Sequence, residues 1–250
     1  MGRAAWVAAV AGLAVAVAGF GCRTTDGIAI EPEANDALRQ MSDLLAGTPS
    51  FRLHSTGTIE ERLESGQVAQ FRRDADILVR RPDRLAAHVR RGPDAYRVWY
   101  QGKTLTILDE RRYVYAVVET PDRIDEMLDF MAEEYGLVFP MADLLYPDPY
   151  EVLTEQVTSG TYVDEQEIGE HRCHHLLFTQ DMVDWQIWID AGGVPVPRRV
   201  VITYNDDPDA PQFDGVLDEW QRVDTGEKDF APTLPKDARQ VEIDELRFGE

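Results

Sequence analysis

The stretch FRLHSTGTIEERLESGQVAQFRRDADILVRR, residues 51–81, decides the fold of this chain. Its apolar residues recur with a period of two on both sides of Glu64-Ser65-Gly66, the pattern of two antiparallel strands joined by a turn. The alternation continues through RPDRLAAHVRR (81–91) and YRVWYQGKTLTILDERRYVYAVVE (96–119), with a turn at Gln101-Gly102-Lys103. Because no helical periodicity interrupts this run, the sequence predicts an antiparallel meander.

Helical segments precede and interrupt the strands. EPEANDALRQMSDLLAG (31–47) and PDRIDEMLDFMAEEYG (121–136) carry apolar residues at helical spacing, and FPMADLLYPDPYEVLTEQ (139–156) is divided by prolines into short helical pieces. Strands return over residues 160–224, with a hairpin at residues 190–193, and the chain closes as a coil with a last short strand. A meandering sheet must cover one face, and the helices are the available cover.

The expected fold class is therefore α+β. We expect a curved antiparallel sheet, an incomplete β-barrel, wrapped over helices, with a helical insert between two strand blocks. The expected domain is single and spans residues 33–250, after a flexible tether at 22–32.

The first 21 residues have the features of a secretory signal peptide: one arginine, an apolar run and then small residues. Cleavage after Ala16-Val17-Ala18 and cleavage at Gly21-Cys22, with lipidation of Cys22, both remain open. No later apolar stretch approaches the roughly 20 residues that a membrane-spanning helix needs. The expected location is the periplasm, either free or tethered to a membrane through Cys22.

The charge of the chain argues against polyanionic partners. Asp and Glu number 46 against 25 Lys and Arg, for a formal net charge of −21. Such a chain is repelled by nucleic acid and by anionic membrane surfaces. If Cys22 is removed with the signal peptide or is acylated, Cys173 has no cysteine with which to form a disulfide bond. No internal disulfide framework is therefore expected.

The stretch HRCHHLLF (171–178) is the densest group of potential metal ligands. On a strand, His171, Cys173 and His175 share one face, but a structural zinc site needs a fourth ligand and recognisable paired spacings. We interpret the stretch as a strand with Cys173 and His175 facing the core, so these residues are only weak metal candidates. No nucleophile, phosphate-binding or dinucleotide motif is present, and neither catalysis nor a cofactor is expected.

The helical insert concentrates soft apolar side chains, including several methionines, which repack readily around ligands of variable shape. Packing of these residues against the sheet is the alternative interpretation. As candidates for lining a ligand cavity the sequence indicates Ile124, Met127, Leu128, Met131, Tyr135, Phe139, Leu144 and Leu145.

Several stretches carry a family resemblance. HRCHHLLF (171–178), DWQIWIDAGGVPVPRRVVITY (184–204) and FPMADLLYPDPYEVL (139–153) resemble a family of predicted periplasmic proteins of unknown function, from about Glu33 to Arg239. That family is similar to the lipoprotein-carrier superfold, which includes LolA- and LolB-like proteins and mycobacterial lipid-transporting lipoproteins. The resemblance implies an incomplete antiparallel barrel with an apolar cavity for acyl chains, and it implies no catalytic residue.

Three hypotheses follow. The first is a non-catalytic carrier of a lipid, an acyl chain of a lipoprotein or another apolar ligand at the cell envelope. The second is a protein-interaction module with a filled core. The third, weaker hypothesis is a metal-dependent hydrolase built on His171, Cys173 and His175.

Overall fold

The structure is a computed structural model that describes residues 29–63 and 65–246. The expected signal peptide (1–21) and the lipidation candidate Cys22 lie outside these residues. Ala29–Ile30, within the stretch expected to be a tether, forms strand β1 and pairs in parallel with Ser159–Gly160. The folded part therefore begins before residue 33. Within the described ranges, no helix combines the length and apolarity needed to cross a membrane.

All strands of the described chain belong to one sheet. They are β1 (Ala29–Ile30), β2 (Ser50–Arg62), β3 (Val68–Arg80), β4 (Arg84–Arg91), β5 (Asp94–Gln101), β6 (Thr104–Asp109), β7 (Val114–Glu119), β8 (Ser159–Ile168), β9 (His171–Thr179), β10 (Val183–Asp190), β11 (Pro197–Tyr204), β12 (Gln212–Arg222) and β13 (Arg239–Gln240). Their order across the sheet is β1-β8-β9-β10-β11-β12-β2-β3-β4-β5-β6-β7-β13. The meander predicted over residues 51–119 is thus confirmed as β2–β7, and the second predicted block of strands is β8–β12.

The two meanders join through β12 and β2, which pair antiparallel with Gly215 opposite Gly57. A Cβ atom added at Gly57 would lie 2.1 Å from the backbone oxygen of Asp214, so this close approach requires glycine. The first strand of one block and the last strand of the other therefore form the centre of the sheet. Only short parallel pairings, β1 with β8 and β13 with β7, lie at its edges.

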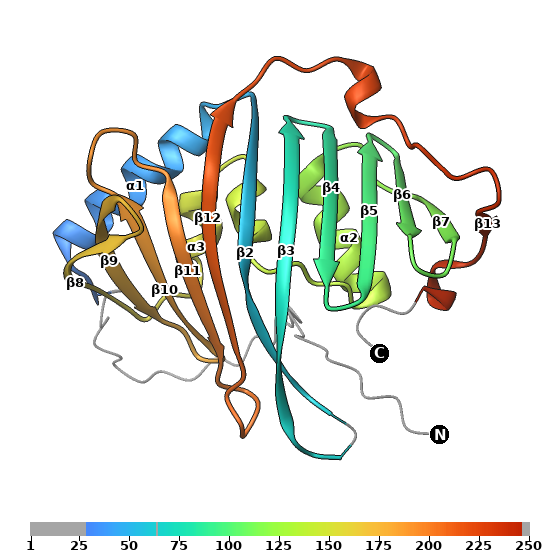
Figure 1. Cartoon of the computed structure of the whole chain (residues 1–250). Coiled ribbons are helices and arrows are strands. Elements are labelled where there is room, and N and C mark those ends of the chain that lie inside the picture. Colours follow the sequence, from blue (N-terminus) through green and yellow to red (C-terminus); the bar gives the residue numbers. More distant parts are fainter. Residues whose placement is uncertain (1–28, 64, 247–250) are drawn as a thin grey trace, which may run out of the picture.

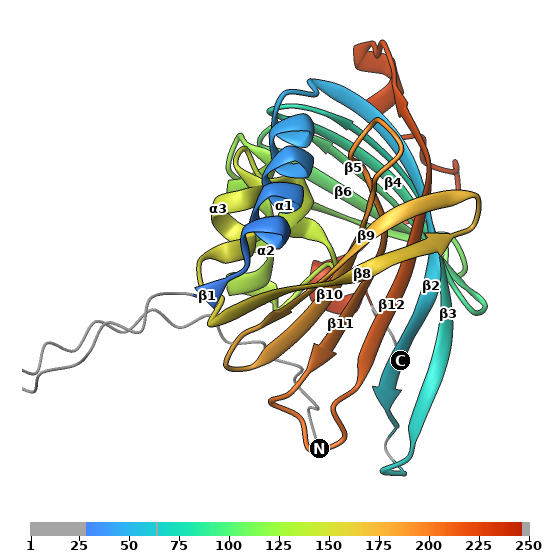
Figure 2. The same cartoon turned by 90° about the vertical axis from the view of Figure 1, so that its left-hand side faces the viewer.

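The sheet curves around the N-terminal helix and the helices of the insert, which lie on its concave face (Figures 1 and 2). The helical elements are α1 (Pro32–Ala46), α2 (Ile124–Tyr135), η1 (Ala142–Leu145), α3 (Pro149–Thr154), η2 (Glu227–Phe230) and η3 (Ile243–Glu245). α2, η1 and α3 form the predicted helical insert between the strand blocks. Gly136 ends α2 in the left-handed conformation (φ 64°), which glycine adopts without strain. The predicted fold class is confirmed.

The main hydrophobic core lies between the concave face and the helices. It contains the buried stripe of α1, including Leu38 and Met41, and Trp185 of β10. A second, small cluster contains Cys173, Trp188 and Val201. Since alternate strand residues point to opposite faces, this cluster lies on the convex face.

Candidate functional site

An apolar cavity of about 100 Å³ lies between the concave face and the helical insert. Its sheet wall comes from β2, β3, β4, β5, β6 and β12, through Leu53, Ser55, Gly57, Arg73, Ala75, Ile77, Leu85, Ala87, Val89, Val98, Leu105, Phe213, Leu217 and Trp220. Its helical wall comes from Met127 and Leu128 of α2 and from the following segment, through Phe139, Pro140, Met141, Ala142, Leu144 and Leu145. We call residues 137–146 the lid segment.

The structure brings together five of the eight cavity candidates. Met127, Leu128, Phe139, Leu144 and Leu145 all line the cavity. The other three do not: Ile124 and Met131 are buried in the core, and Tyr135 is exposed at the end of α2. Helical spacing alone does not separate the side chains that border the cavity from those that pack beside it, because both lie on the buried face of the helix.

The sheet wall and the lid residue Met141 are not among the residues predicted from sequence to line the cavity. The alternation of β2 and β3 does place Leu53, Ser55 and Gly57 on one face, but it does not say which face the helices cover. Met141 has a left-handed backbone (φ 67°), which is uncommon for a residue with a side chain. Its Sδ lies near Gly215, 3.7 Å from where a Cβ atom would be.

Arg81, at the end of β3, holds the lid segment in place. Its Nη1 donates hydrogen bonds to the carbonyl oxygens of Leu145 and Tyr146, the latter at 2.9 Å, and its Nη2 donates to that of Leu144 at 3.1 Å. Burial lowers the pKa of Arg81, although Asp125 acts in the opposite direction. A partly buried guanidinium therefore satisfies carbonyl groups that the short helix η1 leaves free at its end.

A second contact attaches the lid segment to α2. The hydroxyl of Tyr146 donates a hydrogen bond to Oδ1 of Asp129. Burial raises the pKa of Tyr146, and this bond and the carboxylates of Asp129 and Asp143 raise it further. The lid segment is thus attached by polar contacts at its end and by apolar contacts along its length.

The HRCHHLLF strand, β9, is occupied by structural contacts. His175 stacks on Trp188 with ring centroids 4.1 Å apart, and its Nε2 lies 2.9 Å from Oε1 of Gln186. Nδ1 of His171 lies 2.9 Å from Oδ2 of Asp190. Burial raises the pKa of Cys173 to about 11, so the thiol stays protonated at neutral pH and is a poor metal ligand.

The expected orientation of this strand was wrong. Leu176 and Phe178 belong to the main core, whereas Cys173 is buried in the small cluster on the convex face. The reason is that Trp185 and Trp188 of the neighbouring strand β10 point to opposite faces of the sheet. Trp185 stacks on Phe178 and Trp188 stacks on His175, so both faces of β9 are partly buried.

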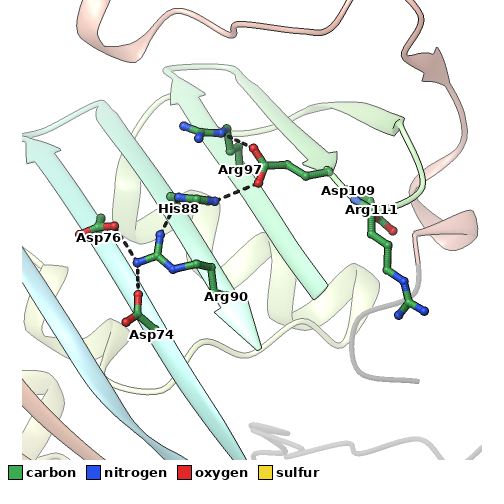
Figure 3. Close-up of polar contacts among 8 residues, drawn as sticks. Asp74, Asp76, His88, Arg90, Arg97, Asp109 and Arg111 are labelled. Carbon is green, nitrogen blue, oxygen red and sulfur yellow. Dashed lines mark hydrogen bonds and ion pairs between the residues drawn. The ribbon is translucent and has the colours of Figure 1, made fainter. Parts of the chain in front are cut away.

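A network of charged side chains covers β3, β4 and β5 (Figure 3). Nη2 of Arg90 pairs with Asp74 and Asp76, its Nη1 lies 2.8 Å from Nδ1 of His88, and Nε2 of His88 lies 3.0 Å from Oε2 of Glu110. His54, Asp74 and Asp76 have ligand atoms close enough to share a metal ion. Arg90 already supplies a positive charge to both carboxylates, so we interpret the group as a surface ion-pair network.

Comparison with known families gives a match over most of the chain. The family described as "Predicted periplasmic protein (DUF2092)" matches residues 34–244. The chain belongs to this family. The resemblance seen in the sequence is therefore confirmed, and the members of this DUF2092 family are predicted to be periplasmic.

A search of curated proteins gives no match. Among solved structures, LprF from Mycobacterium bovis is 18% identical, with a TM-score of 0.47 and coverage of 83% of this chain and 98% of that one. The lipoprotein LppX from Mycobacterium tuberculosis is 14% identical (TM-score 0.49; 78% and 98% covered). A LolA superfamily protein from Nitrosomonas europaea is 10% identical (TM-score 0.37; 80% and 97% covered).

Proposed function

We propose that this DUF2092 protein is a non-catalytic periplasmic binder or carrier of an apolar ligand, such as an acyl chain of a lipid or of a lipoprotein. The observation that carries the proposal is the cavity between the sheet and the lid segment, whose lining is almost entirely apolar. Small-molecule sites are concave, mostly apolar and provided with few polar groups, and this cavity has that composition.

On this proposal the structure is a closed form, because the cavity is small. A cavity of about 100 Å³ is smaller than an engineered cavity of about 150 Å³ that holds a benzene molecule. A chain of eight or more carbons therefore requires movement of the lid segment. Burial of eight methylenes at about 0.8 kcal/mol each contributes about 6 kcal/mol before ordering costs, which exceeds the loss of a few lid hydrogen bonds.

The first test is native mass spectrometry of the mature protein, purified without detergent from the periplasm of a host. The proposal predicts an adduct that extracts into organic solvent and is absent from a variant with a filled cavity. Ala87→Phe places a ring on the cavity wall. Ala86→Phe is its matched control, because Ala86 is the preceding residue of β4 and points to the convex face.

We expect wild type and Ala86→Phe to carry the adduct and to bind the uncharged fluorescent probe N-phenyl-1-naphthylamine. Ala87→Phe should do neither while keeping a folded circular dichroism spectrum. A bare wild-type protein that binds the probe no better than Ala87→Phe would refute the proposal and would favour a protein-interaction module. Stoichiometric zinc in the purified protein would instead favour the hydrolase hypothesis.

A further inference from the structure

Arg73 of β3 is a cation on the wall of the apolar cavity. Its side chain is half-buried, and within residues 29–63 and 65–246 its guanidinium makes no hydrogen bond and no ion pair. A guanidinium has five N–H donors and no acceptor, so a buried one needs oxygen atoms from some source. In Arg73 those donors remain available.

The other described arginines differ from Arg73. Arg62, Arg80, Arg84, Arg90, Arg91 and Arg199 pair with carboxylates, as expected in a chain with a surplus of acid. The described arginines that have neither an ion pair nor a hydrogen bond are otherwise exposed: Arg39, Arg52, Arg72, Arg222 and Arg239. Water satisfies exposed guanidinium groups. Arg73 combines partial burial with a missing partner.

The position of Arg73 is at one end of the cavity. The cavity-lining residues of β3 run Ile77, Ala75, Arg73, toward the part of the β2–β3 hairpin that extends beyond the helices (Figures 1 and 2). Gly57 is its direct neighbour on β2, where the backbone of β12 approaches too closely for a side chain. Ser55, one step closer to the lid segment, adds a hydroxyl with no hydrogen bond among the described residues.

Among the described residues, no carboxylate forms an ion pair with Arg73. Glu61 forms an ion pair with Arg91, which faces Arg73 across β3 and β4. Burial lowers the pKa of Arg73; Tyr204 and Glu61 oppose this, and the positive charge of Arg91 adds to it. Asp143 of the lid segment is close enough to raise the pKa of Tyr204, but it makes no ion pair with Arg73. A buried charge without a partner is unfavourable, and an anion supplied by a ligand would remove that penalty.

We propose that Arg73 binds the anionic head group, a carboxylate or a phosphate, of a single-chain amphiphile whose apolar chain lies in the cavity under the lid segment. This inference rests on the proposed function and adds the class of ligand to it. Charge complementarity selects an anion, and the planar guanidinium suits both head groups because it can donate two parallel hydrogen bonds. Because the cavity must widen to admit even one chain, a single chain is favoured over several.

The test compares three ligands of equal chain length, dodecanoate, dodecyl phosphate and dodecanol, below their micelle concentrations at about pH 8. Their affinities are measured by displacement of N-phenyl-1-naphthylamine from the mature protein. The variants are Arg73→Met, which keeps an apolar stem, and Arg72→Met as the matched control. Arg72 is the preceding residue of β3 and is exposed on the opposite face.

We expect at least one of the two anions to bind wild type about tenfold or more tightly than dodecanol, equivalent to about 1.4 kcal/mol. Whichever anion does so identifies the head group. Arg73→Met should lose this preference with dodecanol affinity unchanged, and Arg72→Met should keep it. A wild type that binds all three ligands equally would overturn the assignment of Arg73 and leave the apolar carrier intact. A wild type that binds none would overturn both proposals.

Thermal denaturation separates ligand binding from a structural role of Arg73. Removing an unpaired, half-buried charge should leave the melting temperature of Arg73→Met equal to that of wild type or above it. A substantially lower melting temperature, together with an unchanged preference for anions, would show that Arg73 stabilises the fold and would refute the proposal. The comparison of ligands on wild type needs no variant, so it remains decisive if Arg73→Met does not fold.

Discussion

Replacement of Arg81 by methionine should release the lid segment without unfolding the sheet. Arg81 donates hydrogen bonds to the carbonyl oxygens of Leu144, Leu145 and Tyr146 at the end of η1. Methionine keeps most of the apolar stem and removes all three bonds. In the variant these carbonyl groups lack a partner in the closed form, whereas they bind water when the segment opens. The substitution therefore destabilises the closed form more than the open form.

The size of the effect follows from these bonds. Hydrogen bonds to charged groups each contribute about 1.5–3 kcal/mol, but bonds from one guanidinium are not additive, and burying the guanidinium has a cost of its own. We therefore expect a net loss of about 2–3 kcal/mol in the free energy of lid opening. At about 1.4 kcal/mol per factor of ten, the open population should rise by about 30- to 150-fold.

Native-state hydrogen exchange measures this population. The backbone N–H groups of Ala142, Leu144 and Tyr146 bond within the lid segment, to Phe139, Met141 and Asp143 respectively. Their protection should fall by the factor given above. Arg80→Met is the matched control, because Arg80 is the preceding residue and makes none of the hydrogen bonds to the lid segment. Its guanidinium lies over the ring of Phe230 and forms a surface ion pair with Glu227, worth about 0–1 kcal/mol.

Two results would refute the reasoning. Unchanged protection of the lid amides in Arg81→Met would show that apolar contacts alone hold the segment. An equal loss of protection in the amides of the sheet would show that Arg81 stabilises the whole fold and not the lid segment.

Two further predictions concern residues that the structure removes from the ligand site. Met131→Ala should lower the free energy of unfolding by about 2–5 kcal/mol in urea titration, because Met131 is fully buried in the core and does not border the cavity; a loss below 1 kcal/mol would contradict this packing role. Burial raises the pKa of the Cys173 thiol to about 11, so its contribution to stability is complete below about pH 9 and declines as pH rises toward 11, since the unfolded thiol loses its proton first. The melting temperature of wild type should therefore fall more than that of Cys173→Ala between about pH 8 and pH 10, and parallel decreases would argue against the shift.

The secondary structure could be predicted from local patterns. Residues 51–119 alternate because each strand has one face on the core, and α1 and α2 carry stripes because each buries one side. The pairing of β12 with β2 could not be predicted in the same way. Its strands are about 150 residues apart in the chain, and their contact depends on Gly57 and Gly215 meeting across the seam.

The candidate site was predictable only in part, because local patterns show which side chains are buried but not which distant residues they meet. The concentration of methionine and other apolar residues indicated the insert, and Met127, Leu128, Phe139, Leu144 and Leu145 do border the cavity. The roles of Arg73 and Arg81 were not predictable. Both lie near arginines that pair with carboxylates in the structure, namely Arg80, Arg84, Arg90 and Arg91.

The sequence by itself determined the composition of each face of each strand and helix, because the period of apolar residues reports burial. Only the tertiary structure decided which face became the inside. Cys173 and His175 lie on the convex face because Leu176 and Phe178, on the other face of the same strand, pack into the main core. Arg73 came to face a cavity, and Arg81 the lid carbonyls, because strands and helices distant in sequence enclosed them. A charge is satisfied by whatever lies within a few ångströms, and that is a property of the packed chain.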